Sequence, residues 1–305
     1  MIAVLAGGVG AARFLQGLTK IVSPRDVTVI VNTGDDIDWY GLRISPDLDI
    51  ITYTLAGIVD ERRGWGLKDD TTHCLQGLDA YGWETWFQVG DRDLATHLYR
   101  THRLRQGADL DKVTAEICKA LNIRVRIIPM SNNFIQTSIT TPNGAVNFQE
   151  YLVKRRMHDP VRGVQFKGIG RAKPAPGVVD SILRSERIVI CPSNPIVSIG
   201  PIISLKGVKE ALVDTDAKVV GVSPIIQGAP VKGPADRLLK GLNLEVSSFS
   251  VAKLYRSFLD VFVIDSKDEA EKPRIEGLGV KVVATKTLME TLEDKTRLAQ
   301  VVLDV

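Results

Sequence analysis

Four of the five aspartates between positions 35 and 49 are candidates for chemistry. Asp35 and Asp36 follow an apolar run, and Asp47 and Asp49 follow a Ser-Pro pair that is typical of a helix start. Carboxylate oxygens are the ligands that Mg²⁺ prefers, so all four are candidate ligands of a magnesium ion that assists phosphate chemistry. The other interpretation is that the loop aspartates bond their own backbone, while Asp47 and Asp49 favour the helix dipole.

A glycine-rich turn precedes these aspartates. Gly7, Gly8 and Gly10 stand between the first apolar run and a helical pattern. Glycines let a backbone approach a phosphate closely, and a helix N-terminus offers unpaired N–H groups. The turn therefore predicts contact with a phosphate. The alternative is a tight turn between a strand and a helix that binds no ligand. It is no P-loop, because no Gly-Lys-Ser/Thr follows, and Arg13 occupies the third glycine position of a dinucleotide fingerprint.

Polar side chains also follow the ends of other apolar runs. Asn32 follows the second run, Ser193 and Asn194 lie between two prolines, and Ser223 precedes a proline. Proline restricts the backbone and makes such loops rigid. Because the carboxyl ends of parallel strands meet at one edge of a sheet, we expect a nucleotide crevice there, although simple connections would look alike. The predicted nucleotide-binding residues are Gly7, Gly8, Gly10, Asn32, Ser193, Asn194, Ser198 and Ser223.

A second helix start follows Gly90. The run Gly90-Asp91-Arg92-Asp93 precedes a helical pattern that contains His97. Arg92 and His97 are candidates for contact with a substrate phosphate or an aromatic ring. The alternative is that Asp93 caps the helix and that His97 is structural.

The elements that must position these residues alternate between strands and helices. Six short, β-branched apolar runs predict buried parallel strands. These runs are Ile2–Ala6, Val27–Val31, Arg187–Cys191, Lys218–Val222, Val261–Ile264 and Val280–Val283. Helical patterns such as Ala11–Ile21, Pro46–Val59 and Leu288–Val301 separate or follow them. This alternation predicts an α/β fold with a Rossmann-like, doubly wound, mostly parallel sheet.

The middle of the chain has a different pattern. Short strands are predicted at Arg124–Pro129, Gln136–Thr141 and Ala145–Tyr151, with a hairpin turn at Thr141–Gly144. No linker divides the chain, so we expect one domain over residues 1–305. Within it, residues from about 60 to 180 are predicted to form an inserted, mixed α+β region over the carboxyl edge of the sheet.

Composition excludes several classes of protein. The chain has 305 residues, 44% of them hydrophobic, and a net charge of +3, which does not favour nucleic-acid binding. No apolar run approaches the length of a membrane span, and the first residues lack the basic and long apolar regions of a signal peptide, so none is expected. Cys74, Cys118 and Cys191 form neither a metal pair nor a disulfide framework, so a cytoplasmic location is predicted. We therefore expect small-molecule partners, with neither a nucleic acid nor a membrane.

The order of the motifs resembles that of the 2-phospho-L-lactate transferase family. The resemblance spans nearly the whole chain, and chance is a poor explanation for so many ordered motifs. The matching segments are Gly7–Gly10, Asn32-Thr33, Ile44–Asp49, Gly90–Asp93, Pro129–Ser131, Pro192–Ile196, Ile199–Ile202 and Val222–Ile226.

This resemblance implies a magnesium-dependent step in the biosynthesis of the deazaflavin coenzyme F420. Enzymes of the family transfer a 2-phospholactyl or enolpyruvyl phosphate group from a guanosine-diphosphate-activated donor. The acceptor is the terminal ribityl hydroxyl of 7,8-didemethyl-8-hydroxy-5-deazariboflavin, and GMP leaves. The resemblance also implies a Rossmann-like fold and a homodimer.

The resemblance further assigns roles to particular residues. The deazaflavin-contacting aspartate of the family matches Asp49, and a second contact, usually basic, falls on Gln88. A neutral amide can bond the ligand but supplies no positive charge. Arg92 is expected to contact the deazaflavin as well. Asp47 and Asp49 are the predicted catalytic residues, which hold Mg²⁺ or orient the ribityl hydroxyl.

Two other functions fit part of the pattern. One is a regulatory nucleotide- or sugar-nucleotide-binding protein of the same superfamily without transferase activity. The other is an NAD-dependent oxidoreductase, which is disfavoured because Asn32 stands where an acidic residue would bind the ribose.

Overall fold

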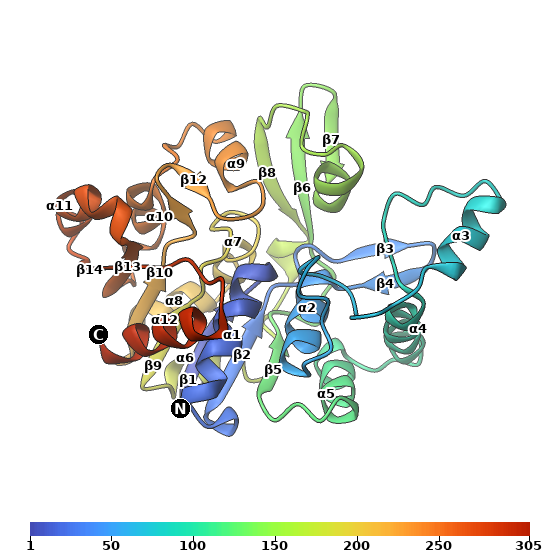
Figure 1. Ribbon diagram of the computed structural model, residues 1–305, viewed down its shortest axis with the longest axis horizontal. Helices are drawn as coiled ribbons and strands as arrows, with labels where there is room; N and C mark the ends of the chain where they lie inside the picture. The colour runs from blue at the N-terminus through green and yellow to red at the C-terminus, as the bar shows by residue number, and fades with distance from the viewer.

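A seven-stranded parallel sheet forms the centre of the computed structural model, which describes residues 1–305 (Figure 1). The strands lie in the order β14-β13-β10-β9-β1-β2-β5, and every neighbouring pair is parallel. Their bounds are β1 (Ile2–Ala6), β2 (Val27–Val31), β5 (Arg126–Pro129), β9 (Arg187–Ile190), β10 (Lys218–Val222), β13 (Val261–Asp265) and β14 (Lys281–Thr285). The predicted fold class is confirmed.

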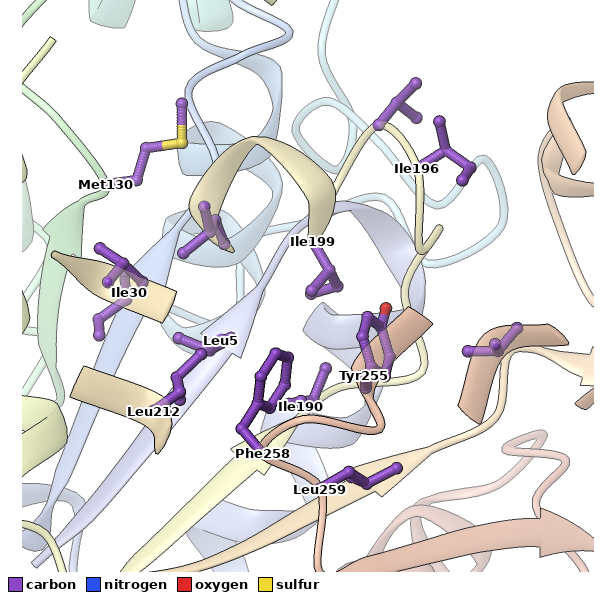
Figure 2. Packing of buried hydrophobic residues seen from close by; sticks show 14 of the residues in the cluster. Leu5, Ile30, Met130, Ile190, Ile196, Ile199, Leu212, Tyr255, Phe258 and Leu259 are labelled. Atoms are coloured by element: carbon purple, nitrogen blue, oxygen red, sulfur yellow. The ribbon is translucent and has the colours of Figure 1, made fainter. Parts of the chain in front are cut away.

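The strands are apolar on both sides because both faces of the sheet are covered. In β1, Ala3 and Leu5 join one buried cluster, while Val4 and Ala6 join a second cluster on the opposite face. Figure 2 shows part of the first cluster, in which Leu5 lies near residues from other strands and helices. Burial on both faces explains why the strand sequences are continuously apolar instead of alternating.

Helices from different parts of the chain cover the two faces. The buried residues of one face come from α1 (Gly8–Ile21), α2 (Pro46–Leu55), α5 (Leu110–Ala120) and α12 (Leu292–Asp304). Those of the other face come from α6 (Val178–Leu183), α7 (Gly200–Ile203), α8 (Val208–Asp214), α9 (Ala235–Gly241), α10 (Ser248–Tyr255) and α11 (Lys272–Glu276). None of the helices combines the length and apolarity that crossing a bilayer requires.

The order of the strands reverses between β1 and β9. From β1 the chain adds β2 and β5 on one side, and it then returns to add β9, β10, β13 and β14 on the other side. Loops that leave two strands at such a reversal diverge and leave a crevice at the carboxyl ends of the strands. The loops at this reversal contain Gly7, Gly8, Ser193 and Asn194.

Smaller elements surround this carboxyl edge. In Figure 1 the antiparallel strands β6, β7 and β8 stand above the sheet, and α3 lies at the end of an arm that projects to one side. The remaining elements are β3 (Ile37–Trp39), β4 (Leu42–Ile44), α3 (His73–Ala80), α4 (Asp91–Arg105), β6 (Gln136–Thr141), β7 (Gly144–Asn147), β8 (Gly163–Lys167), β11 (Ile225–Ile226) and β12 (Ala229–Pro230).

Two predictions for the middle of the chain were wrong in detail. The strand expected at Arg124–Pro129 belongs to the main sheet, where β5 pairs in parallel with β2 instead of joining an antiparallel group. Its apolar residues Ile127 and Ile128 are buried on opposite faces of that sheet. The strand expected at Ala145–Tyr151 ends at Asn147, and one turn of π-helix follows over Glu150–Lys154.

Candidate active site

A cavity of about 580 Å³ opens at the carboxyl edge of the sheet. Its walls include Gly7 after β1, Asp35 after β2, Ser193 after β9 and Ser223 after β10. The cavity therefore lies at the reversal of strand order, where α/β sheets usually bind ligands.

The N-terminus of α1 forms part of one wall. Gly7 is the N-cap in an extended conformation, and Gly8 has φ +71°, which glycine adopts without strain. No acidic residue lies in the first turn of α1. A Cβ on Gly10 would stand 2.2 Å from the carbonyl oxygen of Pro192, so only glycine permits this contact between α1 and the loop after β9. The wall thus offers N–H groups of the first turn, of which that of Gly8 bonds Asp47, and the positive end of the helix dipole.

The loop after β9 adds a free hydroxyl to this wall. Ser193 is buried, its Oγ has no hydrogen-bond partner, and the residue lines the cavity. Asn194 fixes the loop, because its Oδ1 accepts the N–H groups of Ile196 at 3.0 Å and Val197 at 3.3 Å. Ser198 also lines the cavity. A hydroxyl with no internal partner is available to a ligand.

Ser223 and Asn32 have internal partners instead. The Oγ of Ser223 pairs with the hydroxyl of Ser248 at 2.8 Å and accepts the N–H of Ile225. Asn32 is fully buried and does not line the cavity; its Nδ2 donates to Oδ2 of Asp47 at 2.9 Å. The same amide bonds Val197 and Gly34, so all its bonding groups are used. Asn32 therefore holds Asp47 in place.

Asp35 and Asp47 both line the cavity and are almost fully buried. Burial raises the pKa of Asp47 to about 6, although hydrogen bonds from Asn32 and the Gly8 backbone act in the opposite direction. Burial, together with the charge of Asp47, also raises the pKa of Asp35 well above its ordinary value. One carboxylate oxygen of Asp35, Oδ1, has no hydrogen-bond partner. A cation between these two side chains would relieve the cost of burying their charges.

Asp36 points elsewhere. It does not line the cavity, and its Oδ2 accepts the hydroxyl of Ser45 at 2.7 Å. Burial raises the pKa of Asp36 to about 8. The expected cap of α2 is also absent, since Ser45 occupies the N-cap position but makes no side-chain bond to the helix. No three His, Cys, Asp or Glu side chains gather closely enough to hold a metal by themselves, so the four candidate ligands do not form one cluster.

Asp49 lies in the cavity wall and is paired with Arg100 of α4. The guanidinium donates to both carboxylate oxygens, with Nη1 3.2 Å from Oδ2 and Nη2 bonded to Oδ1. His97 of the same helix places Nδ1 3.7 Å from Oδ2 of Asp49. The motifs pointed to His97 only as one of two options and missed Arg100. The sequence feature that could have revealed Arg100 is the spacing of the polar residues at 93, 97 and 100, which share one helix face.

The two residues expected to contact a deazaflavin besides Asp49 are placed differently. Gln88 lines the cavity near its exposed side, where its Nε2 donates to the carbonyl of Thr85 at 2.9 Å. Arg92 lies outside the cavity and donates to the carbonyl of Lys68 at 3.1 Å. Trp65, Phe87, Leu152 and Met157, by contrast, add apolar surface to the lining of the cavity.

Two cations in the wall were also missed. Arg13 and Lys232 line the cavity, and neither forms an ion pair. Partial burial and the charge of Arg13 lower the pKa of Lys232. The Lys232 ammonium donates to the carbonyl of Arg63 at 3.1 Å. Two unneutralised cations beside the α1 N-terminus favour an anionic ligand.

Fold and site together define a Rossmann-like protein whose cavity combines a wall of N–H groups and cations with a set of carboxylates, and the two meet where Asp47 accepts the N–H of Gly8. Comparison with known proteins is more specific. Residues 2–295 match the family model described as 2-phospho-L-lactate transferase CofD. The chain therefore belongs to the 2-phospho-L-lactate transferase CofD family, and it is a transferase of that kind.

Related sequences carry two different names. A phosphoenolpyruvate transferase from Streptomyces coelicolor is 42% identical over 98% of this chain and 96% of the relative. A 2-phospho-L-lactate transferase from Methanosarcina mazei is 41% identical over 98% of both chains. Among solved structures, protein BH3568 from Bacillus halodurans has a TM-score of 0.65 at 18% identity, covering 99% of this chain and 98% of that one. This last similarity shows the shared fold alone.

Proposed function

We propose that the protein transfers a 2-phospholactyl or enolpyruvyl phosphate group from a guanosine-diphosphate-activated donor to a deazaflavin. The acceptor is the terminal ribityl hydroxyl of 7,8-didemethyl-8-hydroxy-5-deazariboflavin, GMP leaves, and the product enters coenzyme F420 biosynthesis. The observation that carries the proposal is one cavity that is lined both by N–H groups and cations and by carboxylates. Relatives of both names support either acid in the donor.

The anion-binding wall suits the diphosphate of the donor. The first turn of α1, Ser193 with its unpartnered hydroxyl, and the cations Arg13 and Lys232 all line the cavity. Such groups bind phosphate oxygens and offset the charge that develops when the bond to GMP breaks. Positioning and electrostatics supply most of the rate in phosphoryl-type transfer, so no strong base is required.

Asp35 and Asp47 fit a magnesium ion. Both are carboxylates, both are buried, and Oδ1 of Asp35 has no partner within the protein. Mg²⁺ commonly takes one or two carboxylates and completes its shell with water and substrate phosphates, so a cluster of three protein ligands is unnecessary. When bound, the ion would neutralise charge on the transferring phosphate.

The apolar side of the cavity and Asp49 suit the acceptor. Trp65 and Phe87 offer aromatic surface for a planar ring, and Gln88 offers an amide nearby. Asp49 carries carboxylate oxygens that can accept a hydrogen bond from the ribityl hydroxyl and orient it for attack at phosphorus. The P–O bond to the acceptor forms as the P–O bond to GMP breaks.

The homodimer and the cytoplasmic location stay predictions. The competing function is a nucleotide-binding regulator without transferase activity. Incubation of the protein with the deazaflavin, Mg²⁺ and each guanylyl-activated acid, followed by mass measurement, separates the two. A product heavier than the deazaflavin by the phospho-acid less one water, with stoichiometric GMP, is expected. Donor binding without any such product would favour the regulator.

A further inference from the structure

Helix α4 buries a face that is made of polar residues. Its buried side chains are Asp93, His97, Arg100 and Thr101, whereas Leu98 and Tyr99 remain 52% and 42% exposed. A helix at the surface of a globular protein normally turns its apolar residues inward. Leu94 and Leu104 of α4 also pack against buried clusters, but all the most deeply buried positions of the helix are polar.

The buried polar residues of α4 join α2 in a ring of contacts. Asp49 and Tyr53 are one turn apart on α2 and face these residues of α4. The hydroxyl of Tyr53 donates to Oδ1 of Asp93 at 2.7 Å, and Nε2 of His97 lies 3.3 Å from the same oxygen. His97 and Arg100 then contact Asp49. Asp49, Tyr53, Asp93 and His97 also line the cavity, so the ring forms part of its wall.

Arg100 is the most constrained member of this ring. Its side chain is 2% exposed, and the two terminal nitrogens of its planar guanidinium reach both oxygens of Asp49. Its Nη1 also lies 3.4 Å from the carbonyl of Arg43 and 3.3 Å from Nδ1 of His97. A two-point contact of this kind fixes the plane of the carboxylate as well as its place.

Stability alone is a poor explanation for this pair. A buried ion pair loses its hydration, and well-packed apolar residues of similar volume often give equal or greater stability. The Nε of Arg100 is buried without a partner, which adds a further cost. The carboxylate that the pair fixes is the one that lines the cavity.

We propose that Arg100 is a positioning residue of the transferase, which acts by fixing the Asp49 carboxylate in the orientation that receives the acceptor hydroxyl. This inference rests on the proposed function. Arg100 touches no substrate and acts only through Asp49. His97 supports the same carboxylate from its other side.

The same helix provides a matched control. Arg103, three residues further along α4, makes an equivalent two-point contact with Glu116 of α5, at 2.9 and 2.7 Å. That pair is partly exposed and lies outside the cavity. Arg103→Gln therefore removes an Arg–carboxylate pair from α4 without touching the site.

The experiment measures kcat and KM for acceptor and donor in four variants: Arg100→Lys, Arg103→Gln, Asp49→Asn, and Asp49→Asn combined with Arg100→Gln. Lysine keeps the charge of Arg100 but loses the two-point contact, so kcat should fall about 10- to 100-fold, with the donor KM within about twofold of wild type. Arg103→Gln should keep wild-type kcat. The double variant should be no slower than Asp49→Asn, because Arg100 has no further role once that carboxylate is gone.

Two results would overturn the inference alone: wild-type kcat in Arg100→Lys, or a further loss of about 10-fold or more when Arg100→Gln is added to Asp49→Asn. Should Arg100→Lys fail to fold, the comparison between Asp49→Asn and the double variant still decides, because the double variant leaves no unpaired charge. Absence of product from the wild-type protein with every donor would instead reject the proposed function, and this inference with it.

Discussion

The two walls of the cavity are built by different means. The anion-binding wall uses the backbone at the start of α1, a free serine hydroxyl and two cations without acidic partners. In the acidic wall, Asp47 is held by Asn32 and Asp49 is held by Arg100. The cations of the first wall have no acidic partner, although the N–H of Gly8 bonds Asp47, whereas the second wall fixes most of its groups before a ligand arrives. The comparison teaches that the proposed phosphate contacts depend on backbone shape, and the proposed carboxylate chemistry on buried partners.

Loss of Asp47 tests the acidic wall most severely. Asp47→Asn should lower kcat about 100-fold or more, because a neutral amide is a weak ligand for a divalent cation. Activity of the wild-type protein should disappear with a chelator and return with Mg²⁺. The matched control is Asp36→Asn, since Asp36 does not line the cavity. Equal losses in both variants would break the distinction between cavity-lining and structural carboxylates.

A methyl group at Gly10 tests the backbone of the other wall. Gly10→Ala places a Cβ 2.2 Å from the Pro192 carbonyl oxygen, so α1 must move away from the loop after β9. We expect a loss of about 1–3 kcal/mol in the free energy of unfolding and weaker GDP binding. Gly77→Ala is the control, because nothing lies within 4 Å of its Cβ position. Unchanged GDP affinity in Gly10→Ala would mean that this contact does not shape the wall.

Removal of the cations tests the charge of the anion-binding wall. Arg13→Gln and Lys232→Gln should each weaken GDP binding about 10-fold, the difference shrinking as salt is raised. Lys240→Gln removes a charge from an exposed position outside the cavity and should leave binding unchanged. Calorimetric titration at two ionic strengths measures the effect. Equal affinities in all three variants would remove the cations from the site.

The smallest effect concerns Asp36 and pH. Burial raises its folded-state pKa from 3.8 to about 8, so between these values the folded protein holds a proton that the unfolded chain releases. This contribution to stability is therefore full below pH 4 and is lost as pH rises to about 8. Asp36→Asn cannot ionise, so its thermal midpoint should fall less than that of the wild type between pH 5 and pH 9. Parallel pH profiles would contradict the buried, protonated state.

Regular parts of the fold could be predicted because they depend on residues that are close together in sequence. β1 and β2 have the predicted bounds, since their continuously apolar residues are buried on both faces. The partner of β5 could not be predicted, because four residues of apolar sequence do not specify which sheet they join. The π-helical turn at Glu150–Lys154 was likewise not predicted, because the apolar residues of the segment around Tyr151 indicated a strand.

The same division applies to the site. The glycine turn could be located from its own residues, but the contacts that require glycine come from other segments, the Asp47 and Ser198 side chains at Gly7 and the Pro192 carbonyl at Gly10. The candidate carboxylates could be located by their position after strands and at a helix start. The residues that hold these carboxylates in place could not be located, because Arg100 is 51 residues away from Asp49 in sequence. Asn32 was expected to contact a nucleotide, but its amide is directed to Asp47 and to the backbone.

The exposure of Leu98 and Tyr99 bears on what fixes the orientation of α4 around its axis. Burying both side chains would require a rotation of about half a turn around the helix axis, because they lie on the side away from the buried face. Such a rotation would separate Arg100 from Asp49 and Asp93 from Tyr53. It would also remove Leu94 and Leu104 from the buried clusters against which they pack, so polar and apolar contacts together fix the orientation of α4 and leave Leu98 and Tyr99 exposed.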